Sequence, residues 1–302
     1  MLSSNRTVDR IPRCDYEGSR YQEDFWTAER SYEDLAERIA LRRLLPPWGR
    51  RIVEIGAGAG RLGDLYEGYE TIYLVDYAKS QLEQAHARWG HDPRFVFVQG
   101  DIYALPFPTG YFDTVVTVRV LHHVKALALA LGEVARVTAP RGFYVTEFAN
   151  KRNLKAVLRY LLGKGKAGEN PFSLEPFEFV PLNVDYHPHH VRQELEDAGF
   201  VVMSELGASF FRLPWLKQRA PASLLARLDG WLQRIAAPLR LSPSIFLQNY
   251  LPKNQEDQEA QWRCPICRSI NVMSTGEGVT CNQCGRAFPL QDGIYLFRSD
   301  SV

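Results

Sequence analysis

Between residues 50 and 150, short apolar runs alternate with longer segments whose apolar residues recur at helical spacing. The runs are largely continuous instead of alternating apolar with polar, which is typical of parallel strands buried on both faces of a sheet. We therefore predict an α/β fold with a doubly wound, mostly parallel sheet. The expected strands are 51–55, 71–75, 95–98, 112–118 and 143–147, and the expected helices are 62–68, 78–89 and 125–137.

Further elements are expected on both sides of this region. Residues 10–45 are expected to be helical, with Ser31 at the first position of a capping-box motif and an end before a pair of prolines. Downstream, a helix at 191–198 is expected to lead into a strand at 200–203. A further apolar run at 244–247 is expected to return antiparallel at the edge of the sheet.

Two segments rich in basic residues do not fit the alternation. Residues 151–166 hold six basic side chains and no acidic one. Residues 210–240 are also basic, and four of their apolar residues have the spacing of an amphipathic helix: Leu224, Leu228, Trp231 and Ile235. We interpret 151–182 and 210–240 as helical insertions that cover one end of the sheet. The predicted organisation is an N-terminal helical segment 1–48, a main domain 49–253, a polar linker 254–261 and a small C-terminal module 262–302.

The composition is that of an ordinary globular protein of 302 residues, with 45% hydrophobic and 24% charged residues. The formal net charge is +1, so any attraction to nucleic acid or a membrane must come from a local patch. No apolar run approaches the ~18 residues that are needed to span a bilayer. The first residues lack the apolar core of a signal peptide. These features predict a cytoplasmic protein without a transmembrane segment.

Four of the five cysteines lie close together near the C-terminus. They form two C-x-x-C pairs separated by thirteen residues, whereas Cys14 stands alone. In a chain without an export signal, this spacing indicates a tetrahedral structural zinc site instead of disulfides. We interpret Cys14 as a small hydrophobic side chain and not as a nucleophile. The predicted zinc ligands are Cys264, Cys267, Cys281 and Cys284.

A glycine-rich turn, residues 56–60, follows the first predicted strand, where open α/β sheets bind nucleotide cofactors. The third glycine of the dinucleotide fingerprint would fall at position 61, which is Arg61. Asp76 ends the second strand and can accept both ribose hydroxyls, and Asp101 ends the third and can reach an adenine amino group. Together with Glu54 inside the first strand, this set favours S-adenosylmethionine, which has one adenosine and no pyrophosphate, over NAD.

Seven short motifs occur in order along the same region. They are Val53-Glu-Ile-Gly-Ala-Gly-Ala-Gly-Arg-Leu, Val75-Asp, Gln99-Gly-Asp, Leu105-Pro-Phe, Phe112-Asp, Leu121-His-His-Val and Ala139-Pro-Arg-Gly-Phe. This set resembles the class I S-adenosylmethionine-dependent methyltransferases, of the type that includes the ubiquinone/menaquinone-biosynthesis C-methyltransferases. The resemblance covers 50–150 closely and 180–252 loosely. It implies a Rossmann-like methyltransferase fold of seven strands in the order 3-2-1-4-5-7-6.

The resemblance also implies which residues contact the cofactor. Gly56, Gly58 and Gly60 would lie against the cofactor, and Asp76 would bind the ribose. Asp101 and Ile102 would contact the adenine, and Glu54 would lie near the methionine end. The helical N-terminus would fold over the cofactor as a lid, with Tyr16, Arg20 and Tyr21 as candidate lid residues. Arg119 departs from the family pattern, which has small or polar residues there. Its side chain could meet the cofactor carboxylate or an anionic substrate.

Two adjacent histidines, His122 and His123, leave the fourth predicted strand at the ligand-binding end of the sheet. They are the candidate catalytic residues, because a histidine with a pKa of about 6.5 can act as a general base when the acceptor must lose a proton. We prefer His122, and the alternative is that both histidines only cap or pack. A second group, His187, His189 and His190, precedes a predicted helix, which favours capping over metal binding.

Two features that are absent from the sequence disfavour particular methylation reactions. No Asn-Pro-Pro-Tyr motif follows the fourth strand, which disfavours methylation of amino groups of adenine or glutamine. No nucleophilic cysteine is expected near the site, which disfavours covalent C5-pyrimidine methylation.

The cysteine-rich segment ends in Phe288-Pro-Leu-Gln-Asp-Gly-Ile. With its cysteines, this tail resembles the small zinc-ribbon proteins that bind and activate methyltransferases of tRNA, rRNA and release factors, and the ribbon of certain rRNA guanine methyltransferases. Such a module could support the catalytic domain or dock a substrate.

Three classes of function remain open. The first is a methyltransferase for a small, lipid-like acceptor, with 210–240 as an apolar lid or as a contact with a membrane surface. The second is an RNA methyltransferase whose basic insertions hold phosphates. The third is a non-catalytic partner or scaffold that binds S-adenosylmethionine. Intact Asp76 and Asp101 weigh against the third class, and the net charge of +1 weighs against the second.

Overall fold

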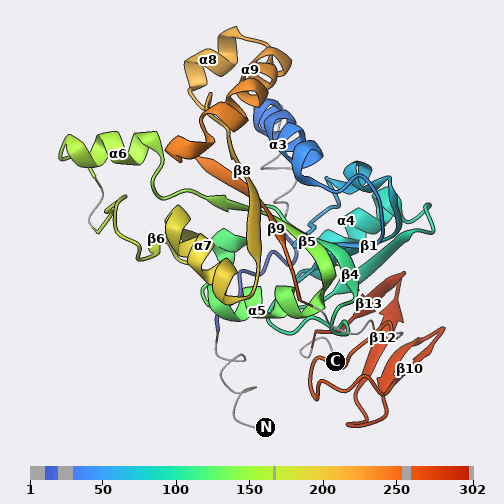
Figure 1. Cartoon of the computed structure of the whole chain (residues 1–302). Helices are drawn as coiled ribbons and strands as arrows, with labels where there is room; N and C mark the ends of the chain where they lie inside the picture. The colour runs from blue at the N-terminus through green and yellow to red at the C-terminus, as the bar shows by residue number, and fades with distance from the viewer. Residues whose placement is uncertain (1–10, 20–29, 166–167, 254–259, 299–302) are drawn as a thin grey trace.

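The computed structural model describes residues 11–19, 30–165, 168–253 and 260–298. Within these residues, the strands form one eleven-stranded mixed sheet and a separate hairpin (Figure 1). The order across the large sheet is β10-β11-β12-β13-β3-β2-β1-β4-β5-β9-β8. Its strands in chain order are β1 (Gly49–Ile55), β2 (Tyr69–Asp76), β3 (Phe95–Gln99), β4 (Phe112–Thr117), β5 (Thr138–Ala149), β8 (Val201–Ala208), β9 (Ser244–Tyr250), β10 (Val272–Thr275), β11 (Gly278–Cys281), β12 (Ala287–Gln291) and β13 (Ile294–Leu296).

The seven strands from β3 to β8 confirm the predicted doubly wound sheet. β3, β2, β1, β4 and β5 are parallel, and β9 runs antiparallel between β5 and β8. With β8 as strand six and β9 as strand seven, this is the expected order 3-2-1-4-5-7-6. The antiparallel direction of 244–247 is confirmed, but its expected place at the sheet edge is wrong, because β8 pairs with its outer side.

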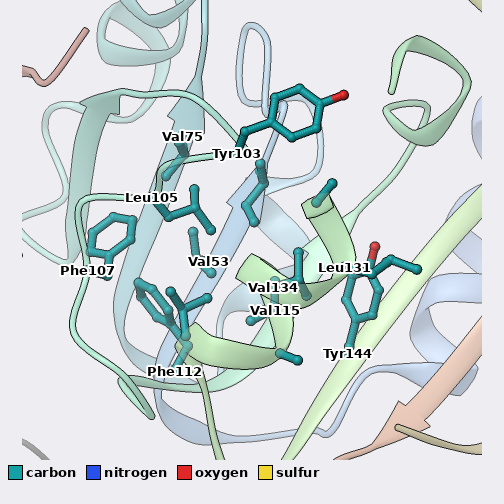
Figure 2. Close-up of a cluster of buried hydrophobic side chains, with 14 of the residues drawn as sticks. Val53, Val75, Tyr103, Leu105, Phe107, Phe112, Val115, Leu131, Val134 and Tyr144 are labelled. Carbon is teal, nitrogen blue, oxygen red and sulfur yellow. The ribbon is translucent and has the colours of Figure 1, made fainter. Parts of the chain in front are cut away.

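Helices cover both faces of this sheet. One face carries α5 (Leu127–Val137) and α7 (Pro188–Asp197), and the other carries α3 (Ser31–Leu44) and α4 (Lys79–Trp89). Figure 2 shows the first face, where valines of the parallel strands meet Leu131 and Val134 of α5. Burial on both sides explains why the strands read as continuous apolar runs.

The remaining elements are short helices and one hairpin. The hairpin joins β6 (Phe177–Val180) and β7 (Asn183–Asp185). The helices are α6 (Leu154–Leu161), α8 (Pro214–Arg219) and α9 (Ala222–Ile235), with 3-10 turns η2 (Gly63–Tyr66), η3 (Leu121–His123) and η4 (Ala237–Leu239). None of the helices in the described part of the chain is long and apolar enough to cross a bilayer.

Two predicted helices differ from the structure. The segment predicted as helix 62–68 is only the 3-10 turn η2, and the indole of Trp89 packs against its first residue, Gly63. The helix expected over 10–45 begins at Ser31, and 11–19 is not helical. Ser31 is the first helical residue and not the cap, since the N-cap is Arg30 and makes no side-chain capping bond.

The C-terminal zinc-ribbon segment continues the main sheet. β13 pairs in parallel with β3, and the Phe297 N–H donates to the Gln99 carbonyl at 2.9 Å. Trp262 is fully buried in the core of the main domain, where its ring stacks on Phe107 with 5.6 Å between centroids. The ribbon therefore covers the β3 edge, which would otherwise expose unpaired backbone groups.

The insertions lie at one end of the molecule, away from the ribbon (Figure 1). The helical prediction for 210–240 is confirmed by α8 and α9. However, the four predicted apolar residues of α9 point outward, and α9 packs on α3 through its smaller residues, including Ala226 and Gly230. A Cβ at Gly230 would approach Ile39 to 3.1 Å, so this small side allows the two helices to pack closely.

Candidate functional site

The turn that follows β1 is held against the end of β2 by backbone hydrogen bonds. The N–H groups of Gly56 and Ala57 donate to the Val75 carbonyl at 2.7 and 3.0 Å. Gly56 has a φ of 74°, and a Cβ there would come within 2.3 Å of Val120 Cγ2, so only glycine fits. This places the turn at the carboxyl ends of the central strands, where open α/β sheets bind ligands.

The next two glycines of the turn face different ways. Gly58 donates its N–H to Asp76 Oδ2 at 2.8 Å and lines a pocket. Gly60 lies against Trp89, whose Nε1–H donates to the Gly60 carbonyl at 2.7 Å. A Cβ at Gly60 would lie 2.9 Å from that ring. Gly60, which was expected against the cofactor, is therefore not among the lining residues and instead fixes the back of the turn.

The pocket beside this turn encloses about 1080 Å³ of empty space, a figure that includes space open to solvent. Its walls come from the carboxyl ends of β1 to β4 and from the segment 12–16. The predicted residues that line it are Glu54, Gly56, Gly58, Asp76, Asp101, Ile102, Arg119, His123 and Tyr16. Arg20 and Tyr21 lie outside the described residues.

Asp76 stands between the glycine turn and α4. Its Oδ2 accepts the Gly58 N–H, and its Oδ1 accepts the Ala78 N–H at 3.0 Å. Burial raises the pKa of this carboxyl group, and the backbone N–H bonds oppose that rise. A carboxylate has about four acceptor positions, so Asp76 keeps capacity for further donors, such as a pair of hydroxyl groups.

Asp101 has a partner that the sequence did not indicate. Arg13 donates to Asp101 Oδ2 from Nε at 2.9 Å and from Nη2 at 2.7 Å, and its guanidinium lies 5.0 Å from the centre of the Tyr103 ring. The Tyr103 N–H donates to Asp101 Oδ1 at 3.0 Å. The segment 11–19 is thus tied across the end of β3. No local pattern around Arg13 signals this contact, because the two residues are 88 positions apart.

Cys14 also lines the pocket, although no nucleophilic cysteine was expected near the site. Burial raises the pKa of the Cys14 thiol, so the thiol stays protonated at neutral pH. A protonated thiol is a weak nucleophile, which agrees with the interpretation of Cys14 as a small hydrophobic side chain. The sequence did not predict its position, because the path of 11–19 has no periodic pattern.

Glu54 is a buried carboxyl group in the pocket wall. Burial raises the pKa of Glu54 to about 7, so its negative charge is costly at this position. Within the described part of the chain, no hydrogen bond reaches its Oε2 atom. A cation with N–H donors would satisfy this oxygen and favour the ionised form.

Arg119 belongs to a buried ionic group. Its side chain forms an ion pair with Glu37 of α3, and its N–H donates to Glu147 Oε2 at 3.0 Å. Arg61 shares Glu37 through a contact of 3.0 Å. The sequence left the role of Arg119 open. The structure gives its guanidinium an internal partner, and the missed residues Glu37 and Glu147 lie on α3 and β5, outside the motifs of the sequence.

The two candidate histidines have different environments. His123 Nδ1–H donates to the Leu182 carbonyl at 2.8 Å, so its Nε2 accepts from the Tyr16 hydroxyl at 2.9 Å. The His122 ring lies 3.9 Å from the His123 ring, and no hydrogen bond reaches it among the described residues. Burial lowers the pKa of His122 well below 6.5, with a further contribution from His123 and Arg119. His122 is therefore a neutral imidazole whose nitrogens are not used by the described chain.

The other histidine group is structural. His187 is the N-cap of α7, and its side chain accepts the His189 N–H at 3.2 Å. The predicted capping role is confirmed for His187.

The four predicted zinc ligands meet in the ribbon. All four Sγ atoms lie within 4.8 Å of one another, and the pairs Cys264–Cys284 and Cys267–Cys281 are 3.7 and 3.4 Å apart. A tetrahedron with Zn–S bonds of about 2.3 Å has edges of about 3.8 Å, whereas a disulfide needs about 2.05 Å. The donor set and its spacing therefore fit one zinc ion and do not fit disulfides.

The ribbon also reaches the pocket. Arg298, just after β13, forms an ion pair with Asp15 at 2.9 Å, and its guanidinium lies 3.9 Å from the centre of the Tyr77 ring. Tyr77 lines the pocket beside Asp76. The sequence predicted neither contact, because it separated the ribbon from the main domain.

Comparison with known proteins agrees with this geometry. The family described as "Methyltransferase domain" matches residues 53–146. A ubiquinone biosynthesis O-methyltransferase of Paracidovorax citrulli is 30% identical over 172 residues, which cover 54% of this chain and 71% of that protein. A malonyl-[acyl-carrier protein] O-methyltransferase of Halorhodospira halophila is 33% identical over 147 residues, 45% of this chain, and the match spans about half, 48%, of that relative's length.

A solved structure shares the fold. A chain from the complex between the Haloferax volcanii Trm112 methyltransferase activator and a methyltransferase has a TM-score of 0.51 and 17% identity, covering 77% of this chain and 92% of that chain. At this identity the likeness concerns the fold alone.

The parallel sheet and the pocket at its carboxyl edge define a nucleotide-cofactor-binding α/β protein. The chain belongs to the class I S-adenosylmethionine-dependent methyltransferases. S-adenosylmethionine is the cofactor of this family.

Proposed function

We propose that this protein transfers a methyl group from S-adenosylmethionine to a small, lipid-like acceptor. The observation that carries the proposal is one pocket that combines a glycine turn, a carboxylate with acceptor capacity at Asp76 and an unbonded buried oxygen on Glu54. A zwitterionic adenosyl amino acid offers matching groups: two ribose hydroxyls and an α-ammonium group. NAD has no ammonium group for Glu54.

Each pocket residue has a proposed task. Asp76 accepts the ribose hydroxyls, and Asp101 and Ile102 contact the adenine. Gly56 and Gly58 let the backbone approach the ligand, and Glu54 accepts from the ammonium group. The bound cofactor supplies an electrophilic methyl group on a sulfonium, so the protein needs mainly to align the acceptor and exclude water. The segment 12–16, which the bond from Arg13 to Asp101 holds in place, covers the pocket and would exclude water from it.

Glu54 gives the proposal a pH signature. Its pKa of about 7 in the free protein means that, below that pH, a proton must leave before the carboxylate can accept from the ammonium group. We expect the affinity for S-adenosylmethionine to fall by up to about tenfold per pH unit below pH ~7. Titration calorimetry from about pH 5.5 to 7 measures this, since the ammonium group stays charged there. The Glu54→Gln variant should bind S-adenosylmethionine weakly at every pH. The Glu83→Gln variant, changed on the exposed side of α4, should show the same dependence of affinity on pH as the unmodified protein. A pH-independent affinity in the unmodified protein would refute the role of Glu54.

His122 is the proposed general base, and His123 holds Tyr16 and the 182 loop in place. The lowered pKa keeps His122 neutral at physiological pH, which is the form that accepts a proton. We expect His122→Ala to lower kcat about 100-fold with unchanged affinity for S-adenosylmethionine, because His122 does not line the cofactor pocket. Activity of the unmodified protein should decline as the pH falls through the folded pKa, below about 6.5. Full turnover by His122→Ala at every pH would eliminate it as the base.

The proposed acceptor class rests on the relatives and on the surface. Two of them are named as O-methyltransferases, one of ubiquinone biosynthesis and one of malonyl-[acyl-carrier protein], so both names place the methyl group on an oxygen atom. The insertion 210–240 presents apolar side chains, and contact of this insertion with a membrane in the cytoplasm is part of the proposal. The four cysteines are proposed to hold one structural Zn²⁺.

One experiment separates the three classes of function. The protein is incubated with methyl-labelled S-adenosylmethionine and a cell extract, which is then divided into RNA, protein, lipid and small-molecule fractions. We expect label in the lipid or small-molecule fraction. Label in RNA would support the second candidate, which the basic insertions favour. Cofactor binding without label in any fraction would support a non-catalytic partner.

A further inference from the structure

The outward side of α9 is apolar, although its inner side already packs on the protein. The inner side is fixed by the buried Asp229, which accepts the Phe210 N–H at 2.8 Å and the Tyr32 hydroxyl. The outer side carries four large apolar residues at spacing i, i+4, i+7 and i+11, and Trp231 is 67% exposed. They are Leu224, Leu228, Trp231 and Ile235. A helix with one packed side and one solvated side would carry polar residues outward.

The helix α6 repeats this arrangement. Its Ala156 is buried, whereas Leu154, Leu158 and Leu161 are exposed at spacing i, i+4 and i+7. The first residue of α6 is bonded to the segment that follows α9 in the chain: the Leu154 N–H donates to the Leu241 carbonyl at 2.9 Å. Figure 1 shows α8 and α9 at the top of the molecule and α6 extending to the left, all on the side away from the ribbon. Trp215 of α8 adds a further exposed aromatic ring there.

The exposed charged residues within 151–165 and 210–240 are all basic. In the described parts of 151–165 and 210–240 the only acidic residue is Asp229, and it is buried. Exposed basic residues flank both apolar rows: Lys155, Lys164, Arg219, Arg227 and Arg234. Exposed leucines and tryptophans with flanking arginines and lysines are typical of helices that lie in the interface of an anionic membrane.

Other occupants fit this surface less well. RNA would pair with the basic residues but leave the leucine and tryptophan rows in water. A second copy in a two-fold contact would bring the same basic residues against each other. An anionic bilayer matches both features, because its headgroups attract the basic residues and its acyl boundary accepts the apolar side chains.

We propose that α6, α8 and α9 form a docking surface for an anionic lipid bilayer. This surface consists of Leu154, Leu158, Leu161, Trp215, Leu224, Leu228, Trp231 and Ile235 with the five flanking basic residues named above. This inference deepens the proposed function and rests on it for the link to a lipid-like acceptor. Docking would bring the protein to the membrane, where such an acceptor is dissolved.

The test is flotation of the full chain with vesicles of phosphatidylcholine, with and without phosphatidylglycerol. We expect binding to the vesicles that contain phosphatidylglycerol, and weaker binding at high salt. Leu228→Asp/Trp231→Asp should reduce that binding about tenfold or more. Arg227→Glu/Arg234→Glu should reduce it at least about 30-fold, since each basic residue lost near an anionic surface removes about 1 kcal/mol and each added carboxylate is repelled. These side chains are exposed, so circular dichroism should be unchanged.

Matched controls carry the same changes elsewhere. Met273→Asp on the ribbon and Arg88→Glu/Arg286→Glu, all at exposed positions, should bind vesicles like the unmodified protein. No binding to anionic vesicles, or undiminished binding by the α9 variants, would overturn the docking surface. Binding of RNA or dimerisation that is lost in the same variants, without vesicle binding, would overturn it too. Calorimetry with S-adenosylmethionine separates the two proposals: failed docking with intact cofactor binding refutes only this inference, whereas absent cofactor binding refutes the proposed function.

Discussion

Replacement of Asp76 by alanine is expected to weaken the binding of S-adenosylmethionine about a thousandfold. In the proposed complex this carboxylate accepts two ribose hydroxyls, and each hydrogen bond to a charged group contributes about 1.5–3 kcal/mol, so the loss is about 4 kcal/mol. Titration calorimetry measures the affinity, and thermal unfolding measures what the substitution does to the fold.

Asp113 offers a closely matched control. Like Asp76, it is partly buried and accepts two backbone N–H groups, those of Arg50 and Arg51 at 2.7 and 2.8 Å, but it lies at the opposite end of the sheet. Asp113→Ala should therefore cost similar stability and leave the affinity unchanged. Equal affinities in the two variants would show that Asp76 has only a structural role.

Removal of zinc is expected to destabilise the whole chain and not the ribbon alone. Without the metal, β13 would separate from β3, and Trp262 would leave a core that it shares with Phe107 and Tyr73. Loss of a buried tryptophan costs about 3–5 kcal/mol, which corresponds to a fall in unfolding temperature of about 10 °C for a domain of this size. Calorimetric unfolding before and after treatment with a chelator, with zinc measured by mass spectrometry, tests this.

The cysteine variants provide the control for zinc removal. Cys264→Ser should lose the zinc and unfold at the lower temperature, while Cys14→Ser should keep one zinc per chain and unfold normally. Because Arg298 contacts Asp15 and Tyr77 at the pocket, the zinc-free chain should also bind S-adenosylmethionine more weakly. A metal-free ribbon that stays folded, or an unfolding temperature that does not change, would contradict this coupling.

The central sheet could be predicted because its strands are buried on both faces, so local apolar runs report tertiary position directly. For α9 the apolar row predicted a helix, which is confirmed, but such a row does not say whether it faces the protein or an outside partner. The ribbon illustrates a second limit. Its cysteine spacing predicts four converging thiols, yet nothing local indicates that Ile294 of β13 pairs beside Phe97.

The sequence predicted part of the pocket, namely the residues at the carboxyl ends of the strands. Glu54, Asp76 and Asp101 lie at or just beyond the carboxyl ends of neighbouring parallel strands, so their convergence follows from the sheet alone. Arg13 and Glu37 belong to segments that precede the sheet in the sequence and fold over it. Their contacts with pocket residues depend on the tertiary structure and have no local sequence pattern. Gly60 shows the reverse case, because its place in a glycine motif suggested a ligand contact, while Trp89 fills the space behind it.

The most direct test of the account is a calorimetric titration of the purified chain with S-adenosylmethionine and, separately, with NADH. The account predicts one saturable site for the first ligand, weakened about a thousandfold by Asp76→Ala and unchanged in Asp113→Ala, and no heat of binding for the second. Saturable uptake of NADH by a chain that ignores S-adenosylmethionine would contradict it.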